Sequence, residues 1–133
     1  MKNGKKNSYE GLQKNIKQIK TPFIEVWNNQ YPEKDYTIKV ETDEFTCICP
    51  KTGLPDFAKI TIEYSPNKHC VELKSFKMYL LFYRNLGIFH EHAVNRILND
   101  FVKSCKPKRA RVTGIFNARG GITTTVSAEY NNE

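Results

Sequence analysis

The sequence predicts an α+β fold in which an antiparallel sheet carries two helices on one face. Two observations lead to this prediction. Apolar side chains alternate along residues 57–65 with the period of a strand, and the apolar side chains of residues 90–103 fall on one helical stripe. The pattern along the chain changes in the order strand, strand, helix, helix, strand, strand. Elements in this order bury their apolar faces as two packed layers.

Each expected element rests on its own residues. The Pro- and Gly-rich stretch 50–55 separates the first two strands. A mostly apolar run predicts the first helix, and Pro107 separates the second helix from the third strand. Gly120 and Gly121 predict a turn before a last strand with many β-branched residues. The expected strands are residues 36–48, 57–65, 110–116 and 122–130, and the expected helices are residues 74–84 and 90–103.

An open sheet of this kind leaves two edge strands with unpaired backbone groups. Small sheets often close such edges by pairing between copies of the chain. The expected order of elements therefore favours a homo-oligomer, and a ring of subunits is one form that would cover these edges.

The charge of the chain is concentrated at its N-terminal end. The 133 residues carry a net charge of +7, and residues 1–20 supply +5 of it through six lysines and one glutamate. We therefore expect a basic, flexible arm over residues 1–22 and a single catalytic domain over residues 23–133. Because the domain itself carries only about +2, we expect no direct binding of nucleic acid.

Neither an apolar run of eighteen residues nor the apolar core of a signal peptide is present, so we expect a cytoplasmic protein that does not span a membrane. The four cysteines are then expected to be free thiols. Cys47 and Cys49 form a C-x-C pair with no second pair of matching spacing, so no metal site is predicted.

Cys49 is the first candidate for chemistry. Pro50 ends the preceding strand, which leaves the thiol at the mouth of a loop. Position alone favours a buried small side chain and an accessible nucleophile equally. Asp56 follows seven residues later, across the turn, where it could protonate an anion formed by thiolate attack or simply cap the turn.

Candidate binding residues lie on and beside the two helices. Glu91 opens the second helix, where it complements the helix dipole, yet a carboxylate can also accept both N–H groups of a purine-like edge. Glu72 could act in the same way, and Phe89 could stack on a flat heterocycle. Lys74 and Lys77 share a helix face that is either a solvated basic surface or, with Arg119, a place for phosphates. No Gly-rich dinucleotide or P-loop motif is present.

Four ordered blocks of the sequence together resemble one family. The resemblance extends from about residue 36 to residue 126 and is to the NADPH-dependent nitrile reductases of queuosine biosynthesis, the 7-cyano-7-deazaguanine reductases, in their short single-domain form. The blocks are Cys49-Pro50-Lys51-Thr52-Gly53-Leu54-Pro55-Asp56-Phe57-Ala58, Val71-Glu72-Leu73-Lys74-Ser75-Phe76-Lys77-Met78-Tyr79, Phe89-His90-Glu91 and Arg119-Gly120-Gly121-Ile122.

The resemblance implies a tunnelling fold whose ββααββ units assemble into rings, usually two stacked pentamers, with active sites between subunits. It implies that Cys49 attacks the nitrile carbon to form a thioimide, that Asp56 donates the proton, and that two NADPH deliver hydrides. The residues implied to bind the deazaguanine substrate are Val71, Glu72, Leu73, Phe89, His90 and Glu91. Those implied to bind NADPH are Lys74, Lys77, Arg119 and Gly120.

Three other functions are compatible with parts of the sequence. An amidine-forming enzyme of archaeosine synthesis would share the thioimide but use no NADPH, and the lysines with Arg119 favour the reductase. A non-catalytic, basic RNA-associated module is disfavoured by the low charge of the domain. A cyclohydrolase-like zinc enzyme is disfavoured because the three histidines, His69, His90 and His92, do not form a ligand set with the cysteines.

Overall fold

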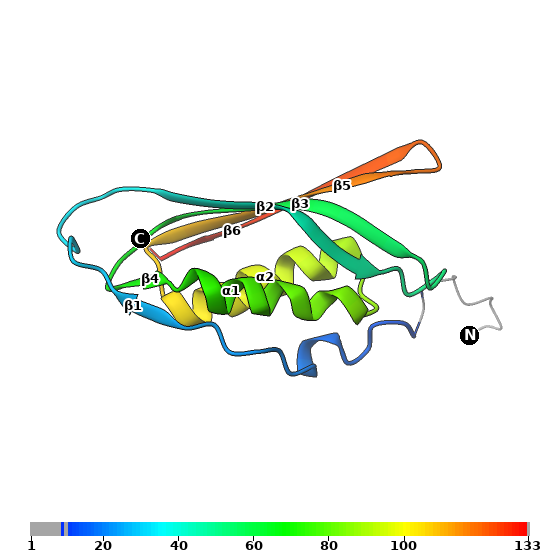
Figure 1. Ribbon diagram of the computed structural model, residues 1–133, viewed down its shortest axis with the longest axis horizontal. Coiled ribbons are helices and arrows are strands. Elements are labelled where there is room, and N and C mark those ends of the chain that lie inside the picture. Colours follow the sequence, from blue (N-terminus) through cyan, green and yellow to red (C-terminus); the bar gives the residue numbers. More distant parts are fainter. Residues whose placement is uncertain (1–8, 10, 133) are drawn as a thin grey trace, which may run out of the picture.

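The structure is a computed structural model that describes residues 9 and 11–132. A four-stranded antiparallel sheet of order β2-β3-β5-β6 forms one layer, and both helices cover one of its faces (Figure 1). The expected α+β fold and its order of six main elements are therefore confirmed. The strands are β2 (Ile38–Ile48), β3 (Pro55–Ser65), β5 (Arg109–Arg119) and β6 (Ile122–Asn131), and the helices are α1 (Leu73–Leu81) and α2 (His90–Cys105).

A second, two-stranded sheet was not predicted from the sequence. It pairs β1 (Val26–Asn28) with β4 (His69–Val71) in antiparallel register. The Trp27 indole donates to the Val71 carbonyl at 3.1 Å, and the backbone N–H of Glu72 donates to Glu25 O at 2.9 Å. Strands of three residues are too short to show a period of two, which is why the pattern missed them.

Several boundaries differ from those expected. Helix α1 ends at Leu81 rather than at residue 84, and the chain continues as the 3-10 helix η2 (Phe82–Asn85), which buries Tyr83. Helix α2 continues two residues further than expected, to Cys105, and ends where Lys106 adopts a left-handed conformation with φ 47° before Pro107. Strand β5 runs three residues past residue 116, so it forms with β6 the long hairpin that projects from the sheet in Figure 1.

The core lies between α2 and the sheet. The apolar stripe of α2 is buried as predicted, and Val94 on this stripe faces Gly114 of β5. A Cβ atom at Gly114 would lie 2.8 Å from Val94 Cγ2 and 3.0 Å from Phe116 Cε1. Glycine is therefore the residue that lets the helix approach the strand this closely.

Part of the expected N-terminal arm packs on α2, whereas its residues 1–8 and 10 lie outside the described part of the chain. The 3-10 helix η1 (Ile16–Gln18) lies in this segment. Arg96 Nη1 donates to the Ile16 carbonyl at 2.8 Å, and the Thr21 hydroxyl donates to Asp100 Oδ2 at 3.4 Å. The described residues of the arm thus follow the surface of α2.

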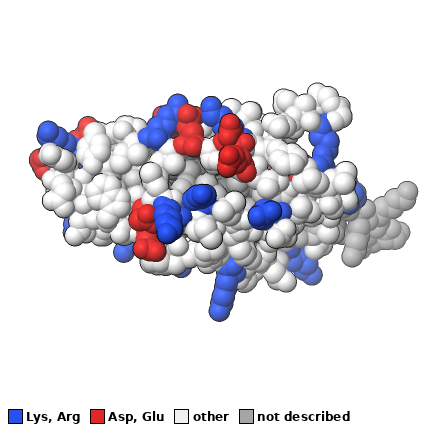
Figure 2. Space-filling view, viewed as in Figure 1, with Lys and Arg blue, Asp and Glu red and all other residues white. Residues whose placement is uncertain are grey.

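On the face shown in Figure 2, acidic and basic side chains are interspersed, and no large patch of one sign covers it. No helix among residues 9 and 11–132 has the length and apolar character needed to cross a membrane.

Candidate active site

The connection between β2 and β3 fixes the position of Cys49. Strand β2 ends at Ile48, so Cys49 is the first residue of the turn. Its backbone N–H donates to the Leu54 carbonyl at 2.8 Å, and its own carbonyl accepts from Gly53 N–H at 2.8 Å. Gly53 has φ +74°, a conformation that favours glycine. The turn therefore holds the Cys49 backbone at both polar groups and leaves the thiol half-buried.

The turn also changes the acidity of this thiol. Partial burial acts to raise the pKa of Cys49, but hydrogen bonds from the Thr52 side chain and from the backbone of Thr52 and Lys51 outweigh it. The pKa of Cys49 is consequently lower than that of an ordinary cysteine. By contrast, burial raises the pKa values of Cys47 and Cys105 to about 12. Cys49 is thus better suited to form a thiolate than either of these two.

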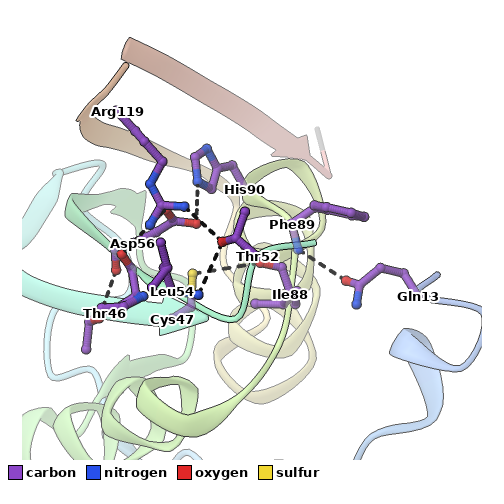
Figure 3. A network of polar contacts seen from close by, with 11 residues as sticks. Gln13, Thr46, Cys47, Thr52, Leu54, Asp56, Ile88, Phe89, His90 and Arg119 are labelled. Carbon is purple, nitrogen blue, oxygen red and sulfur yellow. Dashed lines mark hydrogen bonds and ion pairs between the residues drawn. The ribbon is translucent and has the colours of Figure 1, made fainter. Parts of the chain in front are cut away.

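Asp56 lies on β3 directly opposite Cys47. Only 11% of its side chain is exposed, and its carboxylate has two ionic partners, one at the start of α2 and one at the end of β5. His90 Nε2 lies 3.0 Å from Oδ2, and Arg119 Nη2 lies 3.0 Å from Oδ1. Figure 3 shows these three side chains converging beside the turn. The carboxylate is therefore fixed in orientation by a strand, a helix terminus and a hairpin.

The two partners of Asp56 are themselves held in place. The His90 ring stacks on Phe116, with centroids 3.7 Å apart and planes inclined by 7°. Arg119 Nη2 also donates to the Pro55 carbonyl at 2.6 Å, and Nη1 donates to the Thr52 hydroxyl at 3.3 Å. Arg119 thereby ties the tip of the β5–β6 hairpin to the turn that carries Cys49. Its adjacent Gly120 has φ +60° and open space around its Cα.

The segment before α2 lies against the end of β2. Ile48 N–H donates to Leu86 O, and Ile88 N–H donates to Ile48 O, both at 2.9 Å, so that Ile48 and Gly87 form a parallel bridge. This bridge places the start of α2 beside Cys49. Phe89 is the N-cap residue, and Glu91 is exposed in the first turn.

The other predicted site residues lie elsewhere. Val71, Glu72 and Leu73 join β4 to α1, and the Val71 N–H donates to Tyr64 Oη at 3.0 Å. Tyr64 is eight residues from Asp56 along β3, or about 26 Å at the usual rise of a strand. β4 and the β5–β6 hairpin tip accordingly lie at opposite ends of the molecule in Figure 1.

Glu72 caps α1 with its carboxylate, which accepts from Ser75 N–H at 2.7 Å and from Lys74 N–H at 3.0 Å. These bonds, first that from Ser75, lower the pKa of Glu72. Lys74 and Lys77 are exposed one helical turn apart. Within one chain, therefore, Cys49, Asp56, Phe89, His90, Glu91, Arg119 and Gly120 gather at one end, while Val71, Glu72, Leu73 and Lys74 gather at the other. Lys77 lies between them, partway along α1.

Two residues with a part in the site were missed from the sequence. Thr52 hydrogen-bonds to the Cys49 thiol from three residues away. The turn predicted over residues 50–55 brings residues at this spacing together, so the sequence offered a signal for Thr52. Gln13 contacts Gly87 and Phe89 from more than seventy positions away, and no local pattern points to it. Among the residues that the structure describes, no group of three or more His, Cys, Asp or Glu side chains could hold a metal ion.

Comparison with known proteins identifies the family of the chain. The family described as QueF-like protein matches residues 55–133. A curated protein of Chloroherpeton thalassium, named NADPH-dependent 7-cyano-7-deazaguanine reductase, is 56% identical over 115 residues, which cover 86% of this chain and 99% of that protein. A protein of the same name from Elusimicrobium minutum is 57% identical over 111 residues, covering 84% of this chain and 83% of that protein.

The fold also matches a solved structure. The archaeosine synthase QueF-Like in its apo form superposes with a TM-score of 0.68 at 23% identity, over 73% of this chain and 95% of that one. At this identity the match concerns the fold, and it confirms the tunnelling fold that the resemblance implied. With a family match over more than half of its length and relatives above 50% identity, the chain belongs to the QueF-like family.

Proposed function

We propose that this chain reduces the nitrile of 7-cyano-7-deazaguanine to the aminomethyl group with two NADPH, a reaction of queuosine biosynthesis. The observation that supports it best is the half-buried Cys49, whose lowered pKa favours the thiolate, beside the fixed Asp56 carboxylate. The names of the relatives above 50% identity specify the same substrate and reductant.

The first step uses only residues of this chain and the nitrile. The Cys49 sulfur attacks the nitrile carbon, a C–S bond forms, and one C–N π bond breaks to give a thioimide. Asp56 takes up the proton that the Cys49 thiol gives up and donates it to the nitrile nitrogen, and His90 Nε2 lies 3.0 Å from the carboxylate that relays this proton. The step converts a poor hydride acceptor into a C=N group, which divides one difficult reaction into easier ones.

NADPH, when bound, would supply the two hydrides. Two protons would balance the reaction, one on the amine nitrogen and one on the Cys49 sulfur, which loses its bond to carbon and is free for another cycle. Exposed Lys74 and Lys77 fit a phosphate-bearing cofactor because their ammonium groups lie on one face of α1. Gly120 leaves room for a close approach, and Arg119 could meet a phosphate if it left Asp56.

Substrate recognition would rest on carboxylates. Each Glu72 oxygen accepts one backbone N–H within α1 and retains a further lone pair for a donor of the deazaguanine edge. Exposed Glu91 is placed next to His90, and Phe89 offers a ring face to the heterocycle. Val71 and Leu73 flank Glu72 and would contact the ring with their apolar side chains. A ring without these N–H groups would leave buried carboxylate oxygens unsatisfied, which would select against it.

The separation of the two groups of residues requires a second copy. Glu72 and Asp56 lie too far apart in one chain for one small molecule, so Val71–Lys77 of a neighbouring copy would complete the site. Strands β2 and β6 are the edges of the sheet, and pairing β2 of one copy with β6 of the next would continue it into a ring. Two stacked pentamers are the arrangement that we expect, with residues 23–133 as the catalytic domain of each copy.

Incubation with 7-cyano-7-deazaguanine tests the chemistry. Without NADPH, intact mass spectrometry should show one adduct on the wild type and on Cys105→Ala, and none on Cys49→Ala. With NADPH, the nitrile should drive NADPH oxidation. An adduct without NADPH oxidation would indicate amidine-forming chemistry instead, and the absence of both would exclude nitrile chemistry.

Mixing two inactive variants tests the shared site. Cys49→Ala and Glu72→Ala disable different halves, so each variant alone should be inactive. Random reassembly of equal amounts should restore about one quarter of wild-type activity, because a site then needs an intact half from each of two copies. If the mixture stays inactive while light scattering shows mixed oligomers, both halves belong to one chain and the placement of Glu72 in the site is wrong.

A further inference from the structure

We propose that Gln13, in the N-terminal segment, is a positioning residue for nitrile binding, because its side chain hydrogen-bonds to the backbone of the segment that leads into Phe89, His90 and Glu91. The inference rests on the proposed function and adds to it a residue outside the four blocks that resemble the family.

The segment 86–89 has polar backbone groups on two sides. On one side, Ile48 pairs with Leu86 O and Ile88 N–H. On the other side, Gln13 pairs with Gly87 O and with Phe89 N–H. Its Nε2 donates to Gly87 O at 3.1 Å. Its Oε1 accepts from Phe89 N–H at 3.2 Å, the contact drawn in Figure 3. The side-chain amide of Gln13 therefore makes the pair of hydrogen bonds that the backbone of a neighbouring strand would make.

A third contact extends the same arrangement into α2. His92 Nδ1 lies 3.0 Å from Gln13 Oε1. Because this oxygen can only accept, the hydrogen bond requires the proton on His92 Nδ1. Gln13 thus contacts residues on both sides of His90, and His90 in turn contacts Asp56 at 3.0 Å. The amide fixes the helix start that aims His90 and Glu91 toward the site.

The backbone of Gln13 supports a specific role. Its φ is +66°, a conformation that side chains other than glycine rarely adopt. Such conformations persist where surrounding contacts hold them in place. Arg96 supplies these contacts further along the segment, where its guanidinium donates to the carbonyls of Ile16 and Ile19. Before Gln13, the Tyr9 ring packs edge-on against Phe89 with centroids 4.9 Å apart.

This arrangement predicts an effect on the nitrile rather than on NADPH. Gln13 contacts the segment proposed to hold the deazaguanine edge, whereas Lys74 and Lys77 lie on α1, which Gln13 does not contact through any of these hydrogen bonds. Loss of the Gln13 hydrogen bonds should allow the side chains of Phe89 and His90 to shift from their positions in the site. Misplacement of about 1 Å at a site of this kind can cost up to about a hundredfold in rate.

Two substitutions separate the contacts of Gln13. Gln13→Met keeps the length of the side chain but removes every hydrogen bond. Gln13→Glu keeps the acceptor for Phe89 N–H and loses the donor to Gly87 O. We expect kcat/KM for the nitrile to fall about tenfold in Gln13→Met and by less in Gln13→Glu, with most of the change in KM for the nitrile and the KM for NADPH unchanged.

Gln18→Met provides the matched control, because Gln18 is exposed five positions further along the same segment. It should keep wild-type constants. Adduct formation on Cys49 without NADPH gives a second measurement, and it should require more nitrile in Gln13→Met to reach half of its maximum. The proposal is wrong if Gln13→Met binds the nitrile like the wild type, or if its loss appears in the NADPH KM alone. A wild type that forms no adduct would instead overturn the proposed function.

Discussion

The contact between α2 and β5 at Gly114 leads to a quantitative prediction. A methyl group at Gly114 would lie 2.8 Å from Val94 Cγ2, and both side chains belong to the buried core. Overpacking of this kind costs about 1–3 kcal/mol, so Gly114→Ala should lower the free energy of unfolding by about 2 kcal/mol. Val94→Ala removes the methyl group that Gly114→Ala would meet, and by itself it should cost about 2 kcal/mol through the cavity that it leaves.

The double variant decides whether this contact is the cause. If the two effects were independent, they would sum to about 4 kcal/mol. Because the new methyl group would fill the space that Val94 vacates, we expect the double variant to lose only about 2 kcal/mol, a coupling of about 2 kcal/mol. Urea denaturation at one fixed protein concentration measures all four proteins, since assembly would otherwise shift the midpoints.

The same substitution should also affect the reaction. Phe116 Cε1 lies 3.0 Å from the position of the new methyl group, and Phe116 supports the His90 ring at 3.7 Å. Gly114→Ala should therefore reduce kcat/KM for the nitrile, and the double variant should recover part of it. Thr113→Ala, on the opposite face of β5, is the control for both measurements. If the double variant loses the sum of the two single losses to within about 0.5 kcal/mol, α2 does not pack on Gly114 as described.

Three further changes test other parts of the molecule. The rate at which iodoacetamide alkylates Cys49 should rise with pH, with its midpoint at a lower pH than for an ordinary thiol. Thr52→Val removes a hydrogen bond that lowers the pKa of Cys49, so it should move this midpoint to higher pH. Tyr79→Phe removes the hydroxyl that donates to Asp100 at 2.5 Å, and it should cost about 1–3 kcal/mol in urea denaturation because buried partners lose a hydrogen bond. The pKa of Glu72 is lowered in the folded chain, so its capping contribution is present above the ordinary carboxyl pKa and is lost as the pH falls through the lowered value. The difference in Tm between the wild type and Glu72→Gln should therefore shrink in acid, and a constant difference would contradict the role of the charged cap.

The sequence was sufficient to predict the elements that have a clear period. The alternation in residues 57–65 and the stripe of α2 arise from burial on one face, which the structure confirms. Short elements such as β1 and β4 were missed because three residues can satisfy several patterns, and their pairing depends on residues some forty positions apart.

The candidate site was predictable only in part. The turn between Cys49 and Asp56 brings these residues together locally, so their spacing carried the information. The contacts of Asp56 with His90 and Arg119 span 34 and 63 positions, and they depend on how α2 and the β5–β6 hairpin pack. The sequence equally could not show that Glu72 lies at the far end of the subunit, because that distance is set by the length of β3.

The bridge between Ile48 and Gly87 has a consequence for how the folded chain opens. It joins the end of the strand before Cys49 to the segment that starts α2, so separating one from the other breaks both of its hydrogen bonds. Local opening should consequently expose the amides of Ile48 and Ile88 together, as one cooperative unit. Amide hydrogen exchange would then show equal protection at these two positions, and the turn that carries Cys49 and the helix start that carries His90 would leave the native arrangement in the same event.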